Sequence, residues 1–140
     1  MGTGVYPTTL ASRTAKGPQE RGLVIGAPFI LGPFLLSFET DEQGALVLNA
    51  RDFGFEVEHI RSVVVKALAG TNAGTLTPAN SVGAMATGVV TIALSAALGE
   101  EDSSTPTTNK QIAKGTDFTL TPAKVTDGGK VLVTVYAKYL

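Results

Sequence analysis

The sequence predicts an all-β fold: an antiparallel β-sandwich, jelly roll or small barrel with an extended N-terminal arm. Short apolar runs alternate with polar residues along most of the chain, which is the period of a half-buried strand. Clusters of glycine, proline, asparagine and threonine separate these runs, as turns do in antiparallel β domains. With 140 residues, the chain has the length of one domain with a proper hydrophobic core. We therefore expect an arm over residues 1–22 and a single β domain over residues 23–140.

Residues 23–38, LVIGAPFILGPFLLSF, form an uncharged stretch on which much of the functional interpretation depends. A membrane-spanning helix needs about 20 apolar residues, and this stretch is shorter. Pro28 and Pro33 would each remove a backbone donor and clash with a helical turn. The stretch instead predicts two short extended pieces, LVIGA and FLLSF, joined by a proline-kinked connection.

Further strand-like runs extend from residue 45 to the end of the chain. They are rich in β-branched and aromatic residues, and they cover residues 45–49, 53–60, 62–68, 89–94, 116–121 and 131–139. Alternation groups these side chains on one face of their strands: Phe53, Phe55, Val57 and His59; Phe118 and Leu120; and Val131, Val133, Val135, Ala137 and Tyr139. Asp127-Gly128-Gly129 predicts a tight turn before the last strand.

Residues 69–88 carry no charge and are rich in glycine, alanine, threonine and asparagine. They predict a long connection between strands, with room for one edge strand near GTLTP. Uncharged loops of this length are uncommon unless they contact something. Residues 99–111 predict a second, polar loop. The structural alternative is one short helix within 57–68 or 78–86, because EVEHIRSVVVKAL also fits helical spacing.

Composition limits the classes of partner and site. The formal net charge is −1, so the chain lacks the basic balance typical of nucleic-acid-binding proteins, and we expect neither a nucleic-acid nor a membrane partner. The absence of cysteine excludes disulfides and thiolate metal sites. Charged residues make up 16% of the chain, below the roughly 25% typical of globular proteins. This shortage indicates that part of the surface is not meant to face bulk water.

No motif of an enzyme is present. His59 is the only histidine, and its place on a face with phenylalanines favours a packed or interface role over a catalytic one. The acidic clusters, Glu39, Asp41 and Glu42 and then Glu100, Glu101 and Asp102, fall where turns are expected and lack EF-hand spacing. The string DFG at 52–54 has no accompanying kinase motifs. We expect no catalytic residue, no metal and no cofactor.

The first 22 residues predict either a disordered tail or an arm that becomes ordered on a partner. Val5, Tyr6 and Leu10 would be the apolar anchors of such an arm, and a tail that only interacts with water does not need them. The candidate partner-binding residues of the arm and of the uncharged stretch are Val5, Tyr6, Leu10, Arg13, Lys16, Arg21, Phe29, Ile30 and Phe34.

The C-terminal half resembles virion proteins of tailed bacteriophages. The resemblance lies in IAKGTDFTLTPAKVTDGGKVLVTVYAKYL, in which a glycine turn, an alternating strand, a second glycine turn and a final valine-rich strand follow one another. In this closing pattern, and in its short length, absence of cysteine, basic N-terminus and apolar segment, the chain is similar to capsid decoration (cement) proteins. That resemblance implies a structural virion protein on the outer surface of the capsid, a homo-oligomer expected to be a trimer, which clamps neighbouring major capsid proteins.

Two other functions remain as alternatives. A glycan- or receptor-binding β module of a phage head fibre or tail would use the loops at 69–88 and 99–111, although the scarcity of aromatic residues counts against it. A hydrolase on a jelly-roll scaffold would need a carboxylate pair or metal cluster in a cleft, and neither stands at recognisable spacing.

Overall fold

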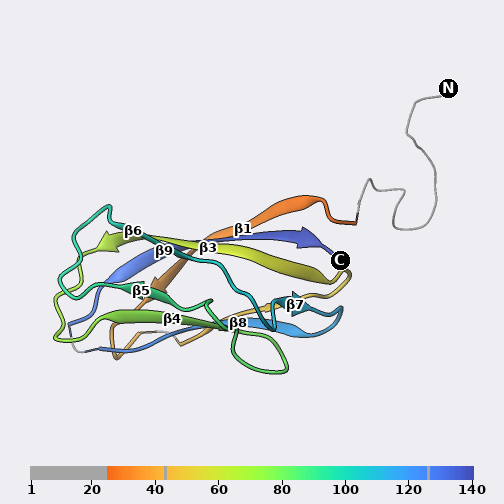
Figure 1. The fold of residues 1–140 in the computed structure, drawn as a ribbon. Helices are drawn as coiled ribbons and strands as arrows, with labels where there is room; N and C mark the ends of the chain where they lie inside the picture. Colours follow the sequence, from red (N-terminus) through yellow and green to blue (C-terminus); the bar gives the residue numbers. More distant parts are fainter. Residues whose placement is uncertain (1–24, 43, 126) are drawn as a thin grey trace.

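A computed structural model describes residues 25–42, 44–125 and 127–140. Within these ranges the chain forms nine strands and no helix (Figure 1). The strands are β1 Pro28–Ser37, β2 Leu46–Asn49, β3 Phe55–Lys66, β4 Gly74–Ala79, β5 Val90–Ile92, β6 Glu101–Ser104, β7 Gln111–Ile112, β8 Asp117–Pro122 and β9 Lys130–Tyr139. The described residues therefore include no helix with the length and hydrophobicity needed to cross a bilayer.

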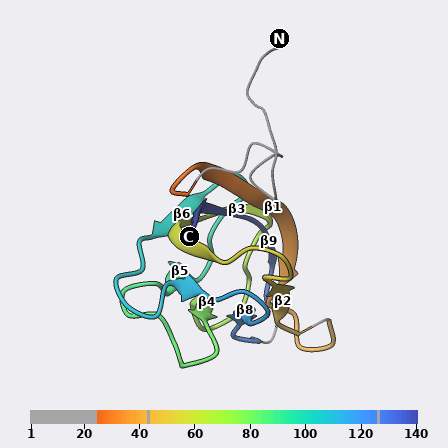
Figure 2. The ribbon, with the colours of Figure 1, turned by 90° about the vertical axis from the view of Figure 1, so that its right-hand side faces the viewer.

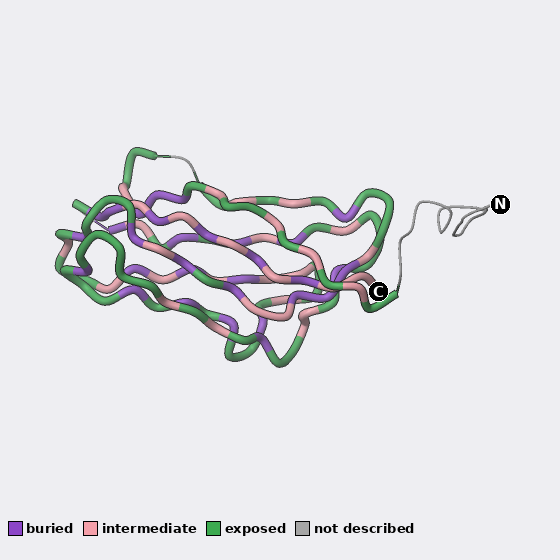
Figure 3. Tube along the Cα trace, turned by 90° about the horizontal axis from the view of Figure 1, so that it is seen from above, coloured by how far each residue is buried: buried purple, intermediate pink, exposed green. Residues whose placement is uncertain are grey.

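The strands form two antiparallel sheets that pack face to face (Figure 2). One sheet has the order β1-β9-β3-β6, with the short β7 also paired to β3, and the other has the order β2-β8-β4-β5. Buried and more exposed residues alternate along the strands (Figure 3). Phe55 of the first sheet meets Phe118 of the second edge-to-face, with ring centroids 6.5 Å apart. The predicted all-β sandwich is confirmed.

The core consists of the inward side chains of both sheets. The largest fully buried ones are Phe38, Phe118, Leu36, Ile60, Leu76, Met85, Ile92, Ile112 and Leu120. Most of the face assignments in 116–121 and 131–139 are confirmed, since Phe118, Leu120, Val131, Val133, Val135 and Ala137 are all buried. Tyr139 shares their face but is only half-buried.

β1 is one strand, so the predicted division of residues 23–38 into two pieces is wrong. Leu31 pairs with Val135 and Phe34 with Val133, which leaves one extra residue in β1 at Gly32–Pro33. Gly32 has a φ of 102°, which favours glycine, and a bulge tolerates a proline that cannot donate a ladder hydrogen bond. Gly32 and Pro33 therefore form a β-bulge, which interrupts the regular pairing without ending the strand. Within the predicted LVIGA piece, residues 23 and 24 lie outside the described residues, and 25–27 precede the strand.

β3 merges the predicted strands 53–60 and 62–68 and contradicts two face assignments. Val57 pairs with Ala137 but His59 with Tyr136, so a bulge shifts the alternation. Ile60 is consequently the fully buried residue, and His59 points to the outer face. Phe53 precedes the strand and is partly exposed. The alternative of a helix within 57–68 or 78–86 is wrong, because residues 57–66 belong to β3, an interior strand of its sheet, and residues 78–86 contain the end of β4 followed by turns.

Two connections contain more strand than expected. The GTLTP segment forms β4, which is an interior strand between β8 and β5 rather than an edge strand. The expected polar loop at 99–111 contains β6, which pairs with β3 through Ile60–Val63. Its sequence, Glu101–Ser104, has no apolar residue, so hydrophobic periodicity could not indicate it.

Candidate interaction sites

The predicted partner-binding residues fall into three groups. Val5, Tyr6, Leu10, Arg13, Lys16 and Arg21 lie outside the described residues. Phe29 and Phe34 are half-buried on the inner side of β1, where they pair with Ala137 and Val133 of β9. Ile30 lies on the outer side and its side chain is 60% exposed.

Phe29 belongs to an aromatic cluster at the end of the first sheet. Its ring stacks on Tyr139 with centroids 4.3 Å apart and meets Phe55 edge-to-face at 5.9 Å. Phe53 in turn contacts Tyr139 edge-to-face at 6.2 Å. These contacts hold the start of β1 against the end of β9.

The outer face of the first sheet carries apolar side chains near its β1 edge. Leu35, Leu132 and Val63 stand directly opposite one another on β1, β9 and β3. A second row is formed by Ile30 and Tyr136, with His59 beyond them. We refer to Ile30, Leu35, Val63, Leu132 and Tyr136 as the β1 face. Ile30 and Leu35 are 60% and 49% exposed, and the other three are half-buried.

Polar residues border the β1 face. Arg61 Nε donates to Glu101 Oε1 at 3.0 Å, and this hydrogen bond raises the pKa of the arginine. The His59 ring lies 5.8 Å from Tyr136 and forms a hydrogen bond between Nδ1 and Thr105 Oγ1 at 3.2 Å. An apolar centre with a charged border is the composition found in protein interfaces.

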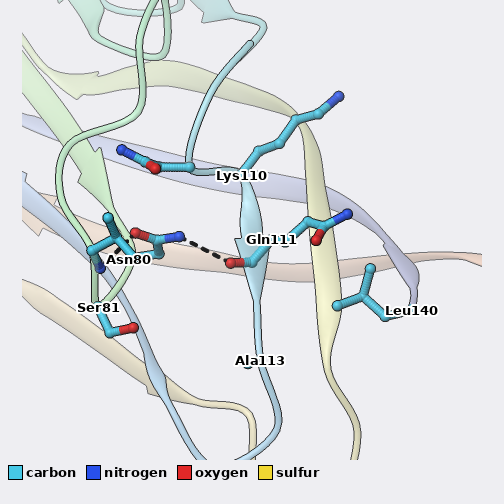
Figure 4. A pocket seen from close by; sticks show the side chains of 8 residues that line it. Asn80, Ser81, Lys110, Gln111, Ala113 and Leu140 are labelled. Atoms are coloured by element: carbon cyan, nitrogen blue, oxygen red, sulfur yellow. Dashed lines mark hydrogen bonds between the residues drawn. The ribbon is translucent and has the colours of Figure 1, made fainter.

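A pocket of about 480 Å³ lies at the end of the sandwich where β7 and the C-terminus meet (Figure 4). Uncharged polar and apolar groups dominate its lining, which consists of Asn80, Ser81, Val82, Asn109, Lys110, Gln111, Ala113 and Leu140. The volume falls in the range of about 300–1,000 Å³ typical of ligand sites. We call this site the loop pocket. It joins the two segments, 69–88 and 99–111, that the sequence named as candidate binding loops.

Asn80 fixes one wall of the loop pocket. Its Oδ1 accepts hydrogen bonds from the backbone of Val82 at 2.9 Å and Gly83 at 3.1 Å, which closes a tight turn. Its Nδ2 donates to the carbonyl of Gln111 at 3.0 Å, and this bond ties the two walls together (Figure 4). Asn109 Nδ2 adds a second tie, to the carbonyl of Ala84 at 2.9 Å. The pocket is therefore shaped before any ligand arrives.

Glu56 fixes the side chains of Lys110 and Gln111, which form the other wall of the loop pocket. Only 8% of Glu56 is exposed. Gln111 Nε2 donates to its Oε1 at 3.2 Å, and Lys110 Nζ and Lys138 Nζ lie 3.2 and 3.5 Å from its Oε2. Burial opposes ionisation, but hydrogen bonds with Gln111, Glu58 and Lys110 outweigh it and lower the pKa of Glu56 to about 2. The carboxylate is thus charged at neutral pH, and it fixes two residues that line the pocket.

Of the two acidic clusters, Glu39, Asp41 and Glu42 come closest together. One carboxylate oxygen from each lies within 4.8 Å of the others. Lys66 Nζ lies 2.5 Å from Glu39 and Lys130 Nζ 3.2 Å from Glu42, so lysines already neutralise two of the three charges. The hydrogen bond from Lys66 also lowers the pKa of Glu39. We assign no ion to this cluster.

Comparison with known proteins gives little information. No family model matches the sequence, and no curated protein matches it. A solved structure that matches is CsCBM6-3 from Clostridium stercorarium in complex with cellobiose, with 18% sequence identity and a TM-score of 0.37. The alignment covers 82% of this chain and 86% of that one. Similarity of this degree does not bear on function, and the sandwich architecture rests on the strand pairing described above.

Proposed function

We propose that this protein is a structural virion protein that binds the outside of an assembled bacteriophage capsid and stabilises it by clamping neighbouring major capsid proteins. The observation that carries the proposal is the β1 face, where Ile30 and Leu35 expose apolar side chains on the edge strand of a sheet. The resemblance of the C-terminal half, roughly residues 60–140, to phage virion proteins supplies the class of partner.

The energetics suit such a role. A stable protein interface buries about 1,600 Å² in total, and burial of apolar area contributes about 25 cal/mol per Å² before association costs. Ile30 and Leu35 would lose the most exposed apolar area on docking, because they are the most exposed side chains of the β1 face. A protein that binds only the assembled shell stabilises that shell by mass action.

A charge on the β1 face tests the docking. We expect Ile30→Glu to weaken co-sedimentation with empty capsid shells of a phage that encodes this protein by about 10-fold or more, because an unpaired carboxylate would be buried. Val47→Glu is the matched control, since Val47 is 55% exposed on β2 of the other sheet. Both variants should keep wild-type stability to within about 0.5 kcal/mol. Equal binding by the two variants, or no binding by the wild type, would contradict the proposal.

The proposed assembly is a trimer whose arm, residues 1–22, grips neighbouring subunits of the shell. Light scattering on the full chain and on a version lacking residues 1–22 should give the trimer mass for both. Shell binding should weaken in the shortened version alone. A monomer in both cases would exclude a preformed trimer.

A second candidate function is a glycan- or receptor-binding module. The specific observation that favours it is the loop pocket, which joins segments 80–82 and 109–113 at one end of the sandwich.

A further inference from the structure

We propose that the loop pocket is a binding site for an uncharged saccharide. This inference rests on the second candidate function and is independent of docking through the β1 face. It follows from three properties of the pocket: its free polar atoms, its charge balance and its exposed apolar side chains.

The pocket offers polar atoms that have no partner in the described part of the chain. Asn109 and Gln111 each use the amide nitrogen in a hydrogen bond, to Ala84 and Glu56 respectively, and the amide oxygen remains open. The hydroxyl of Ser81 likewise has no hydrogen bond within the described residues. Two acceptors and one hydroxyl that can donate or accept match the hydroxyl groups of a sugar, which also do both.

The charge balance of the pocket disfavours an anionic ligand. Lys110 carries the only charged side chain among the described residues of the lining, and its ammonium group lies 3.2 Å from the Glu56 carboxylate. An anionic ligand would have to compete with this ion pair. A neutral polar ligand would leave the ion pair intact.

Apolar side chains complete the lining. Val82 at the tip of its turn is 80% exposed, and Leu140 is 43% exposed on the far side of Gln111 (Figure 4). Sugars carry C–H faces between their hydroxyl groups, so both kinds of surface can be covered at once. The described residues that line the pocket include no aromatic side chain, so we expect a weak site with a dissociation constant of about 1 mM, or about −4 kcal/mol.

The test is a ¹H–¹⁵N NMR titration of the full chain with glucose, galactose, N-acetylglucosamine, maltose, lactose and N,N′-diacetylchitobiose, each up to about 50 mM. Inorganic phosphate serves as the anionic comparison. At least one saccharide should shift the amide signals of residues 80–83 and 109–113 in a saturable way, and phosphate should not. Shifts with phosphate alone would overturn the inference.

Three variants locate the site. Ala113→Phe places a ring in the pocket and should abolish the saturable shifts, whereas Ala97→Phe, at an exposed alanine between β5 and β6, should bind as the wild type does. Ser81→Ala removes one open hydroxyl and should weaken binding by about 2- to 10-fold. Binding that persists in Ala113→Phe would overturn the loop pocket but keep a saccharide-binding function elsewhere. If none of the saccharides binds the wild type, both the inference and the glycan-binding candidate fail, and capsid docking is unaffected.

Discussion

Gly129→Ala is expected to destabilise the protein by about 3 kcal/mol or more, at the upper end of the range for overpacking. A Cβ at this position would lie 2.1 Å from the carbonyl oxygen of Lys66 and 2.8 Å from that of Ala67. Both obstacles are backbone atoms where β3 ends beside β9, so no side-chain rotation relieves the clash. Relief requires the two strands to separate where Phe38 also donates its backbone hydrogen bond to Gly129, at 2.9 Å.

Urea unfolding followed by circular dichroism measures the loss. Gly44→Ala is the matched control, because a Cβ there would meet nothing within 4 Å. It should change the free energy of unfolding by no more than about 0.5 kcal/mol. Equal stability of the two variants would show that the ends of β3 and β9 can move apart at little cost.

Glu56→Gln is expected to lower the free energy of unfolding by about 2 kcal/mol at pH 7. Removing one member of a buried ion pair costs about 3–5 kcal/mol. Here the lysine side chains are 35% and 41% exposed, so water reduces the cost. Glu42→Gln is the control: the Glu42 side chain is 40% exposed beside Lys130, and its loss should cost less than about 1 kcal/mol.

The same carboxylate predicts how stability depends on pH. In the folded protein the pKa of Glu56 is lowered from 4.5 to about 2. The unfolded chain therefore binds this proton first as the pH falls, so the contribution of Glu56 is complete above about pH 4.5 and is lost toward pH 2. Unfolding measured between these values should show a steeper loss of stability in the wild type than in Glu56→Gln. Parallel curves would mean that Glu56 does not titrate abnormally.

The sequence predicts the strands that follow a simple alternation. β8 and β9 could be assigned with their faces because an apolar residue occupies every second position. β3 could be located but not oriented, since the bulge between Val57 and His59 reverses the alternation without any glycine or proline to indicate it. β6 could not be found, because its residues are polar and only its backbone joins the sheet.

The candidate sites were likewise predictable only in part. The long uncharged loop at 69–88 indicated a contact surface, and the loop pocket uses part of it. Alternation alone would place Glu56 on the face opposite Phe55 and Val57, and it gives no sign that this carboxylate is buried. Its burial depends on Lys110 and Lys138, which are 54 and 82 positions away in the sequence and approach it only once β7 and β9 have paired with β3. Ion pairs between such distant residues leave no periodic pattern in a single sequence.

The pairing of Gly26 and Ala27 with Tyr139 has a consequence for protein engineering. The amide of Gly26 donates to the carbonyl of Tyr139 at 2.7 Å, and the amide of Tyr139 donates to the carbonyl of Ala27 at 3.1 Å. The two ends of the sandwich domain therefore lie side by side (Figure 1). A short glycine linker could therefore join residue 140 to residue 25, with new termini opened at Gly99, whose φ of 85° marks an exposed turn. Such a circular permutant would carry a fused passenger at the opposite end of the domain, away from the loop pocket.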